Sequence, residues 1–395
     1  MNFAQFKSVH RRDVRLFLSL LLLSGLAASA SAATLKPMPS GIYDLLFDPN
    51  HDADVDLASN PVLDNPNVDG FRLRVGWSAV QPDNGDSYNW DAIDSVVAVA
   101  TAHGKKICIS ISAGLWTPDW VYTSAPVVYK YTMKETDPDT GQSLGSQPLP
   151  WDTVFQAKWG EFVAAFGERY DSNPTVTYVV MGGFMENFNM YLAGIDDDAN
   201  AMTALAEKPP QGYPGLTTSY PDFSSAYTPA AQALISSFAT NFPTTSLVLT
   251  LAQVIPGDVG LILQNTVVDW AKAAYPVQIG TMVSALYAVP PPHIAPPAPL
   301  TFPKGFQLVC RAATDPARLY QDPDPSPIPA EPQPLQDALE HGVSLDAIYI
   351  EVYEADLTPD DSQPVLASER AKLAANVWDG KPPDVPPPPT GLHVL

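Results

Sequence analysis

The sequence predicts a single (β/α)8 barrel with long βα loops and a proline-rich C-terminal linker. First, strand-like and helix-like apolar patterns alternate along about 340 residues, which favours a parallel sheet with helical crossovers. Second, several expected strands are apolar on one face and polar or small on the other, which is typical of barrel strands covered by helices. Third, hydrophobic residues make up 46% of the chain and charged residues 16%, so a large core can form.

Residues 1–32 have the pattern of a secretory signal peptide. Four basic residues precede the apolar run Leu16–Leu23, and small residues follow as far as Ala32, where signal peptidase would cut. We therefore expect a secreted or periplasmic protein whose mature chain begins near Ala33. The barrel is then expected over residues 33–380.

The mature chain is strongly acidic. Removing residues 1–32 takes away four basic residues and one acidic residue, which changes the net charge from −22 to −25. Such a charge argues against nucleic acid and anionic membrane surfaces as partners. After the signal peptide, no apolar run is long enough to span a membrane.

The expected strands of the barrel have period-two alternation or short apolar runs. They lie at residues 41–47, 70–77, 106–113, 176–180, 246–252, 277–288, 305–312 and 345–353. The expected helices have apolar residues at helical spacing. They lie at residues 91–103, 153–170, 229–241, 259–275, 335–341 and 367–377.

The two proline-rich segments are expected to be extended. Residues 289–303 hold seven prolines, which excludes a helix there. Residues 381–395 read as a linker, and Pro389–Leu392 looks like the opening strand of a fibronectin-type module. Such a C-terminal module is a possible partner domain that this chain does not contain.

The first candidate catalytic residue is Glu186. It follows the expected strand 176–180 and the pair Gly182–Gly183, which allows a sharp turn. Phe184, Met185 and further apolar residues surround it in the sequence, and burial raises the pKa of a carboxyl group enough to make it a general acid. The alternative is an ordinary loop glutamate that caps a helix or pairs with an arginine.

The second candidate is Glu351, on the last expected strand. Ile348, Ile350 and Val352 share one face, so Glu351 and its neighbours of the same parity point into the barrel. An inward carboxylate is costly unless it is paired or functional, and two carboxyl groups are the minimum for cleaving a glycosidic bond. Glu354 is a weaker candidate. Because we expect Glu351 to be unpaired, we expect its replacement not to unfold the protein.

Residues 70–107, from GFRLRVGW through the helix to HGKKI, resemble clan A glycoside hydrolases, particularly their beta-galactosidase-like branch. The shared features are a tryptophan at the strand end, the stretch Pro82–Trp90 with its Gly, Tyr and Trp, and a following helix. The resemblance implies a retaining glycosidase with its acid/base after strand four and its nucleophile on strand seven. Counting places Glu186 after the fourth strand and Glu351 on the eighth.

Other side chains at strand ends are candidates for binding a sugar, which needs flat apolar rings and hydrogen-bonding groups. They are Arg72, Trp77, Trp116, Trp120, Asn187, Tyr287, Gln307 and Tyr353. For each aromatic residue the alternative is core packing. For Arg72, or Arg74 in its place, the alternative to holding a carboxylate is a structural ion pair.

The sequence shows no metal-ligand spacing among its histidines and no phosphate-binding or dinucleotide motif, so no metal and no cofactor is expected. Cys108 and Cys310 lie in separate expected strands and are expected to stay reduced. The sequence thus predicts an exported, metal-independent glycoside hydrolase acting on carbohydrate, and the resemblance implies a retaining mechanism. The alternative is an inactive barrel that binds glycan at a cell surface or matrix.

Overall fold

The computed structural model describes residues 34–46, 52–85, 87–126, 128–132, 145–185, 192, 222–252, 254–255, 257–286, 303–308 and 335–376. All of them belong to one compact unit that begins at Thr34. Among these residues, no helix is both long and apolar enough to cross a bilayer.

Eight parallel strands close into a barrel, which confirms the predicted fold class. In chain order they are β1 (Gly41–Leu45), β2 (Gly70–Gly76), β3 (Lys106–Ser112), β6 (Val176–Val180), β7 (Ser246–Thr250), β8 (Ile279–Leu286), β9 (Lys304–Leu308) and β10 (Ala347–Val352). Around the barrel the order is β1-β10-β9-β8-β7-β6-β3-β2. Glu351 is therefore on the eighth barrel strand, and β6, the fourth, lies opposite it.

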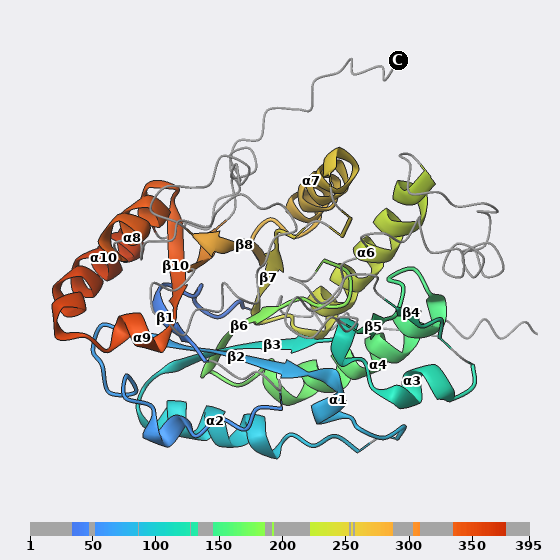
Figure 1. Cartoon of the computed structure of the whole chain (residues 1–395), viewed down its shortest axis with the longest axis horizontal. Helices are drawn as coiled ribbons and strands as arrows, with labels where there is room; N and C mark the ends of the chain where they lie inside the picture. Colours follow the sequence, from blue (N-terminus) through green and yellow to red (C-terminus); the bar gives the residue numbers. More distant parts are fainter. Residues whose placement is uncertain are drawn as a thin grey trace, which may run out of the picture. The chain divides into compact units, whose positions relative to one another are not determined.

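Helices surround the strands on the outside (Figure 1). The longer ones are α2 (Asp91–Ala102), α4 (Thr153–Tyr170), α6 (Asp222–Asn241), α7 (Gly257–Ala274), α8 (Leu335–Ser344) and α10 (Gln363–Ala375). Short helices follow three of the strands: α1 (Trp77–Val80), α3 (Asp119–Thr123) and α9 (Glu354–Leu357). A small antiparallel hairpin, β4 (Tyr131–Thr132) with β5 (Ser146–Gln147), lies outside the barrel sheet.

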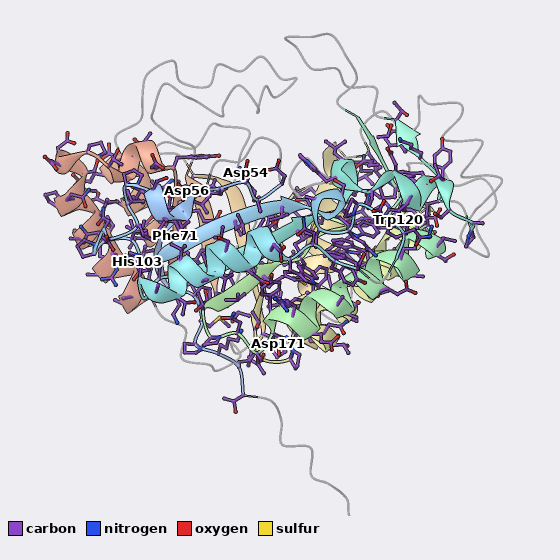
Figure 2. All side chains as sticks on the ribbon, turned by 90° about the horizontal axis from the view of Figure 1, so that it is seen from below. Asp54, Asp56, Phe71, His103, Trp120 and Asp171 are labelled. Atoms are coloured by element: carbon purple, nitrogen blue, oxygen red, sulfur yellow. The ribbon has the colours of Figure 1, made fainter. Side chains whose placement is uncertain are left out.

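The outer layer of the core follows the sequence pattern closely. The α2 residues at helical spacing, from Ile93 to Ala100, are buried against the outward face of β2 and β3. Phe71, labelled in Figure 2, belongs to this layer and is fully buried. The α2 helix ends before Gly104, whose φ of 66° is the left-handed conformation expected after a helix C-terminus.

Helix α6 begins earlier than its proline suggests. The sequence predicts a start at Pro229, but the helix already begins at Asp222 and contains Pro229. Proline removes one backbone donor from a helix interior. The added turns bury Tyr227, whose hydroxyl donates to the backbone oxygen of Phe184 at 3.0 Å, and this tertiary contact offsets the missing bond.

Three tyrosines fill the barrel interior toward its N-terminal end. The ring centroids of Tyr178 and Tyr349 are 5.0 Å apart, and Tyr43 lies 5.6 Å from Tyr178. Gly305 makes room for them, since a Cβ there would lie 2.0 Å from the Tyr349 ring. These rings form a packed floor beneath the polar groups of the interior.

Candidate active site at the C-terminal end of the barrel

Glu351 is the central polar group of the barrel interior. Its side chain is fully buried, with 0% of its surface exposed. The Nη1 atom of Arg72 donates to both of its carboxylate oxygens, at 2.8 and 3.2 Å. The hydroxyl of Tyr178 donates to Oε1 at 2.7 Å. The carboxylate is therefore held in one position by two strands, β2 and β6.

Strand alternation and register explain why Arg72 and Tyr178 both reach Glu351. Arg72 of β2 pairs in register with Cys108 of β3, which pairs with Tyr178 of β6. All three share the inward parity of their strands, so their side chains converge at one level. Of the two arginines that the sequence allows, Arg72 is the one that holds a carboxylate.

The electrostatics keep the three groups in complementary states. Burial acts to lower the pKa of Arg72, but the charge of Glu351 and its hydrogen bond raise it more, so the net shift is upward. Burial raises the pKa of Tyr178 well above its usual value. The arginine therefore stays charged and the tyrosine stays a hydrogen-bond donor to the Glu351 carboxylate.

The ion pair corrects the expectation that Glu351 is an unpaired carboxylate. An arginine left in the barrel without its partner is an uncompensated buried charge. Replacing Glu351 is thus expected to destabilise the fold, contrary to what the sequence suggested.

The turn that leads to Glu186 is described up to Met185, and Glu186 itself lies outside the described residues. Gly183 has a φ of 93°, which confirms the sharp turn expected of the glycine pair. The indole nitrogen of Trp159 donates to the oxygen of Gly182 at 3.1 Å. A Cβ on Gly183 would lie 2.7 Å from that same nitrogen.

Trp77 lies in the core and presents no ring face at the strand ends. It is fully buried beside Trp159, with ring centroids 5.0 Å apart, and its Nε1 donates to Gln81 at 2.8 Å. The reason is that Trp77 starts α1 and turns to the outside of the barrel. We leave it out of the candidate site.

Two other tryptophans are partly exposed in the segment after β3. Trp116 packs over Gly76, where a Cβ would lie 2.6 Å from its ring. Trp120 donates to the oxygen of Gln81 at 3.0 Å, and the ammonium of Lys158 lies 5.3 Å from the centre of its ring. Figure 2 shows Trp120 beyond the C-terminal end of β2, and His103 toward the opposite end. Both tryptophans therefore remain candidates.

Of the remaining residues predicted to bind sugar, the structure describes some side chains and leaves others outside the described residues. Tyr353 follows β10 and is 8% exposed, packed with Leu45. Gln307 pairs with Glu351 in register, but its side chain is not described. Asn187, Tyr287 and Cys310 lie outside the described residues, whereas Cys108 is a buried free thiol.

Sequence reasoning missed two functional contacts. Tyr178 was assigned only to the apolar run of its strand, although its inward parity could have indicated a donor. Trp159 lies in a helix 24 residues before Gly183, and no local signal points to their contact. Among the described residues, no group of three or more histidine, cysteine or acidic side chains could hold a metal ion.

The sequence of this chain is similar to one family of glycoside hydrolases. Residues 62–183 match the sequence model of the glycoside hydrolase family described as beta-galactosidase (Glyco_hydro_42). The resemblance to the beta-galactosidase-like glycoside hydrolases is confirmed. No curated protein matches the chain.

Solved structures confirm the fold at low sequence identity. The catalytic domain of a beta-amylase from Paenibacillus polymyxa has 10% identity and a TM-score of 0.52, over 88% of this chain and all of that one. A cold-adapted beta-galactosidase from Rahnella sp. R3 has 12% identity and a TM-score of 0.50, over 87% of this chain. The chain spans 58% of that beta-galactosidase.

Proposed function

We propose that the protein is an exported, retaining glycoside hydrolase in which Glu186 is the acid/base and Glu351 the nucleophile. The observation that carries the proposal is the fixed position of the Glu351 carboxylate, which accepts hydrogen bonds from Arg72 and from Tyr178 of β6, the strand that continues to Glu186. The hydrogen bond from Tyr178 spans the barrel between these opposite strands. The match to the beta-galactosidase family over residues 62–183 supports the reaction class.

In this mechanism Glu186 protonates the glycosidic oxygen while a Glu351 oxygen attacks the anomeric carbon, and the leaving group departs as an alcohol. Glu186 then removes a proton from water, which displaces Glu351 from the glycosyl ester with net retention. Arg72 and Tyr178 hold the Glu351 carboxylate in position for the attack and accept it again when water breaks the ester. No step is assigned to a metal ion.

The complete burial of Glu351 favours a second candidate function. A nucleophile has to reach the anomeric carbon, and this carboxylate has 0% exposure and an arginine partner. A barrel that binds glycan without cleaving it needs no accessible carboxylate at this position. Both functions share three features. The ligand is a carbohydrate, residues 1–32 are a signal peptide for export, and the same side chains bind the sugar: Trp116, Trp120, Asn187, Tyr287, Gln307 and Tyr353.

The decisive experiment is hydrolysis of aryl β-galactosides and other aryl glycosides by the wild type and by four variants. Glu186→Gln is expected to retain activity on substrates with good leaving groups, because these hardly need protonation. Glu351→Gln is expected to abolish turnover of all substrates. Glu168→Gln is the matched control, since Glu168 is an exposed glutamate on the outer helix α4 and its replacement should leave hydrolysis unchanged.

The fourth variant separates catalysis from stability. Arg72→Met with Glu351→Leu removes both charges, so neither remains buried alone, and the nucleophile is absent. We expect this variant to fold and to be inactive. Activity in the folded double variant would show that Glu351 is not the nucleophile, and oligosaccharide binding without any hydrolysis by the wild type would establish the binding barrel.

A further inference from the structure

Arg74 is a second arginine on the inward face of β2. It lies two residues nearer the C-terminal end of that strand than Arg72, with the same parity, and its register partner on β3 is Ser110. It is half-buried, whereas Arg72 is almost completely buried. Arg74 therefore extends into the barrel from the side at which substrate would enter.

The guanidinium of Arg74 is without an acceptor in the described part of the chain. Its Nε is buried and has no hydrogen-bond partner there, and no ion pair of Arg74 is found. The two oxygens of Glu351 accept from Arg72 and Tyr178, and no hydrogen bond joins Glu351 to Arg74. Buried polar groups in native proteins are nearly always hydrogen-bonded, but the residues that the structure describes supply no acceptor for this Nε.

The buried arginine below strengthens this conclusion. Arg72 is 3% exposed, and its own Nε also has no partner among the described groups. Among the residues that the structure describes, the inward face of β2 thus has two N–H groups without an acceptor and two positive charges, and one carboxylate, Glu351, pairs with Arg72. The excess is notable because the mature chain as a whole is strongly acidic.

We infer that Arg74 binds the carboxylate of an acidic sugar, so that the substrate class is a uronic-acid-containing glycan. A guanidinium presents parallel N–H donors that match a carboxylate in a bidentate arrangement. The hydroxyl of the register partner Ser110 is a further donor or acceptor at the same level. The inference rests on the proposed function in taking the ligand to be a glycan.

The test uses a matched pair of substrates that differ only at C6. These are 4-nitrophenyl β-galactoside and the corresponding 4-nitrophenyl β-galacturonide, in which a carboxylate replaces the hydroxymethyl group. We expect the wild type to favour the acid by about 10- to 100-fold in kcat/KM, which is the range of a charge-assisted hydrogen-bonded pair. In Arg74→Gln the ratio of acid to neutral substrate should fall to about 1, and in Arg74→Lys it should be intermediate.

The control is Arg169→Gln, which removes one positive charge from an exposed pair with Asp94 on the outer helices. Arg169→Gln should leave the ratio of acid to neutral substrate unchanged, because we attribute the preference to direct contact with Arg74 and not to the total charge of the protein. If Arg169→Gln lowers the ratio as much as Arg74→Gln does, the inference is wrong. Equal use of both substrates by the wild type overturns the inference while the proposed hydrolase stands.

A binding measurement on the wild type tests the inference even if the protein cleaves no glycoside or the Arg74 variants do not fold. Thermal unfolding is followed with galacturonate, galactose or acetate at equal ionic strength. Stabilisation by galacturonate alone supports the acidic-sugar site even if no glycoside is cleaved. Equal stabilisation by acetate would show a site for any small carboxylate, and equal stabilisation by galactose would show no role for the charge; either result contradicts the inference.

Discussion

At the scale of single residues, the barrel interior depends on how its buried charges are paired. Glu351 is acceptable there because Arg72 and Tyr178 supply donors. Asp44 of β1 is a contrasting case on the outward face of the barrel, where it is in register with Val352. It is fully buried, Asn60 donates to one of its oxygens at 2.9 Å, and the other oxygen has no partner among the described residues.

The Arg72–Glu351 pair is expected to couple strongly in a double-mutant cycle. Arg72→Met leaves Glu351 as a lone buried charge and should lower the free energy of unfolding by about 3–5 kcal/mol. Adding Glu351→Leu should restore most of the loss, although each change alone is destabilising. Urea unfolding of the four proteins measures the coupling; additive losses would mean that the ion pair does not decide stability.

Asp44 is expected to make the protein less stable as the pH rises. Burial raises its pKa to about 7, with a smaller contribution from Glu354, and the hydrogen bond from Asn60 only partly opposes this. Between pH 4 and 7 the folded protein keeps a proton that the unfolded chain, with its ordinary pKa of 3.8, has lost. Stability therefore falls with rising pH in this window and stays low above it.

Asp44→Asn removes this loss while keeping an acceptor for Asn60. The variant should be more stable than the wild type at pH 8 by up to about 4 kcal/mol, and nearly equal to it at pH 4. The control is Asp54→Asn, the same change at an exposed aspartate (Figure 2). A stability difference that does not change between pH 4 and pH 8 would contradict the assignment.

At the scale of elements, the turn after β6 determines where Glu186 is placed. Its backbone is anchored from three sides, by Val248 on β7, Trp159 on α4 and Tyr227 on α6. Outer helices thus fix a segment that leads to the C-terminal end of the barrel. Such supporting contacts determine how precisely a catalytic group is held.

Gly183→Ala is expected to damage both stability and activity. The φ of 93° is unfavourable for alanine, and the new Cβ would lie 2.7 Å from the indole of Trp159, so a loss of about 1–3 kcal/mol is expected. Gly85→Ala is the matched control, because a Cβ there meets nothing within 4 Å.

Trp159→Phe keeps the ring and removes the donor to Gly182. If the contact positions Glu186, kcat should fall more for natural glycosides than for substrates with good leaving groups, since only the former need the proton. Parallel losses on both kinds of substrate would indicate a purely structural role.

At the scale of the whole molecule, the N-terminal segment closes the other end of the barrel. The ammonium of Lys36 donates to the backbone oxygens of Asn173 and Val176 and to the hydroxyl of Thr245. These bonds join the segment to the starts of β6 and β7. A mature chain that begins at Ala33, as proposed, retains this closure.

Lys36→Met is expected to lower the free energy of unfolding by about 1–3 kcal/mol, because buried acceptors lose their donor. Lys130→Met, at a more exposed lysine, should change it little. Denaturant unfolding compares the two variants, and mass spectrometry of the exported protein tests the start at Ala33. A chain that begins beyond Lys36 would be incompatible with the closure.

The amino-acid sequence alone determined the eight strands, their inward and outward faces and the eighth-strand position of Glu351. These features depend on local periodicity, and alternation along a strand fixes a side chain's face regardless of what lies opposite. It also predicted the sharp turn at Gly182–Gly183, and the structure then placed the positive φ at Gly183.

Only the tertiary structure decided which groups meet across the barrel. It paired Arg72 rather than Arg74 with Glu351, brought Tyr178 to the same carboxylate and placed Trp77 in the core beside Trp159. It also showed that Glu351 is paired with Arg72, where the sequence suggested an unpaired charge. The physical reason is that barrel closure and strand register set the level of each side chain, and these depend on contacts between residues as far as 279 positions apart.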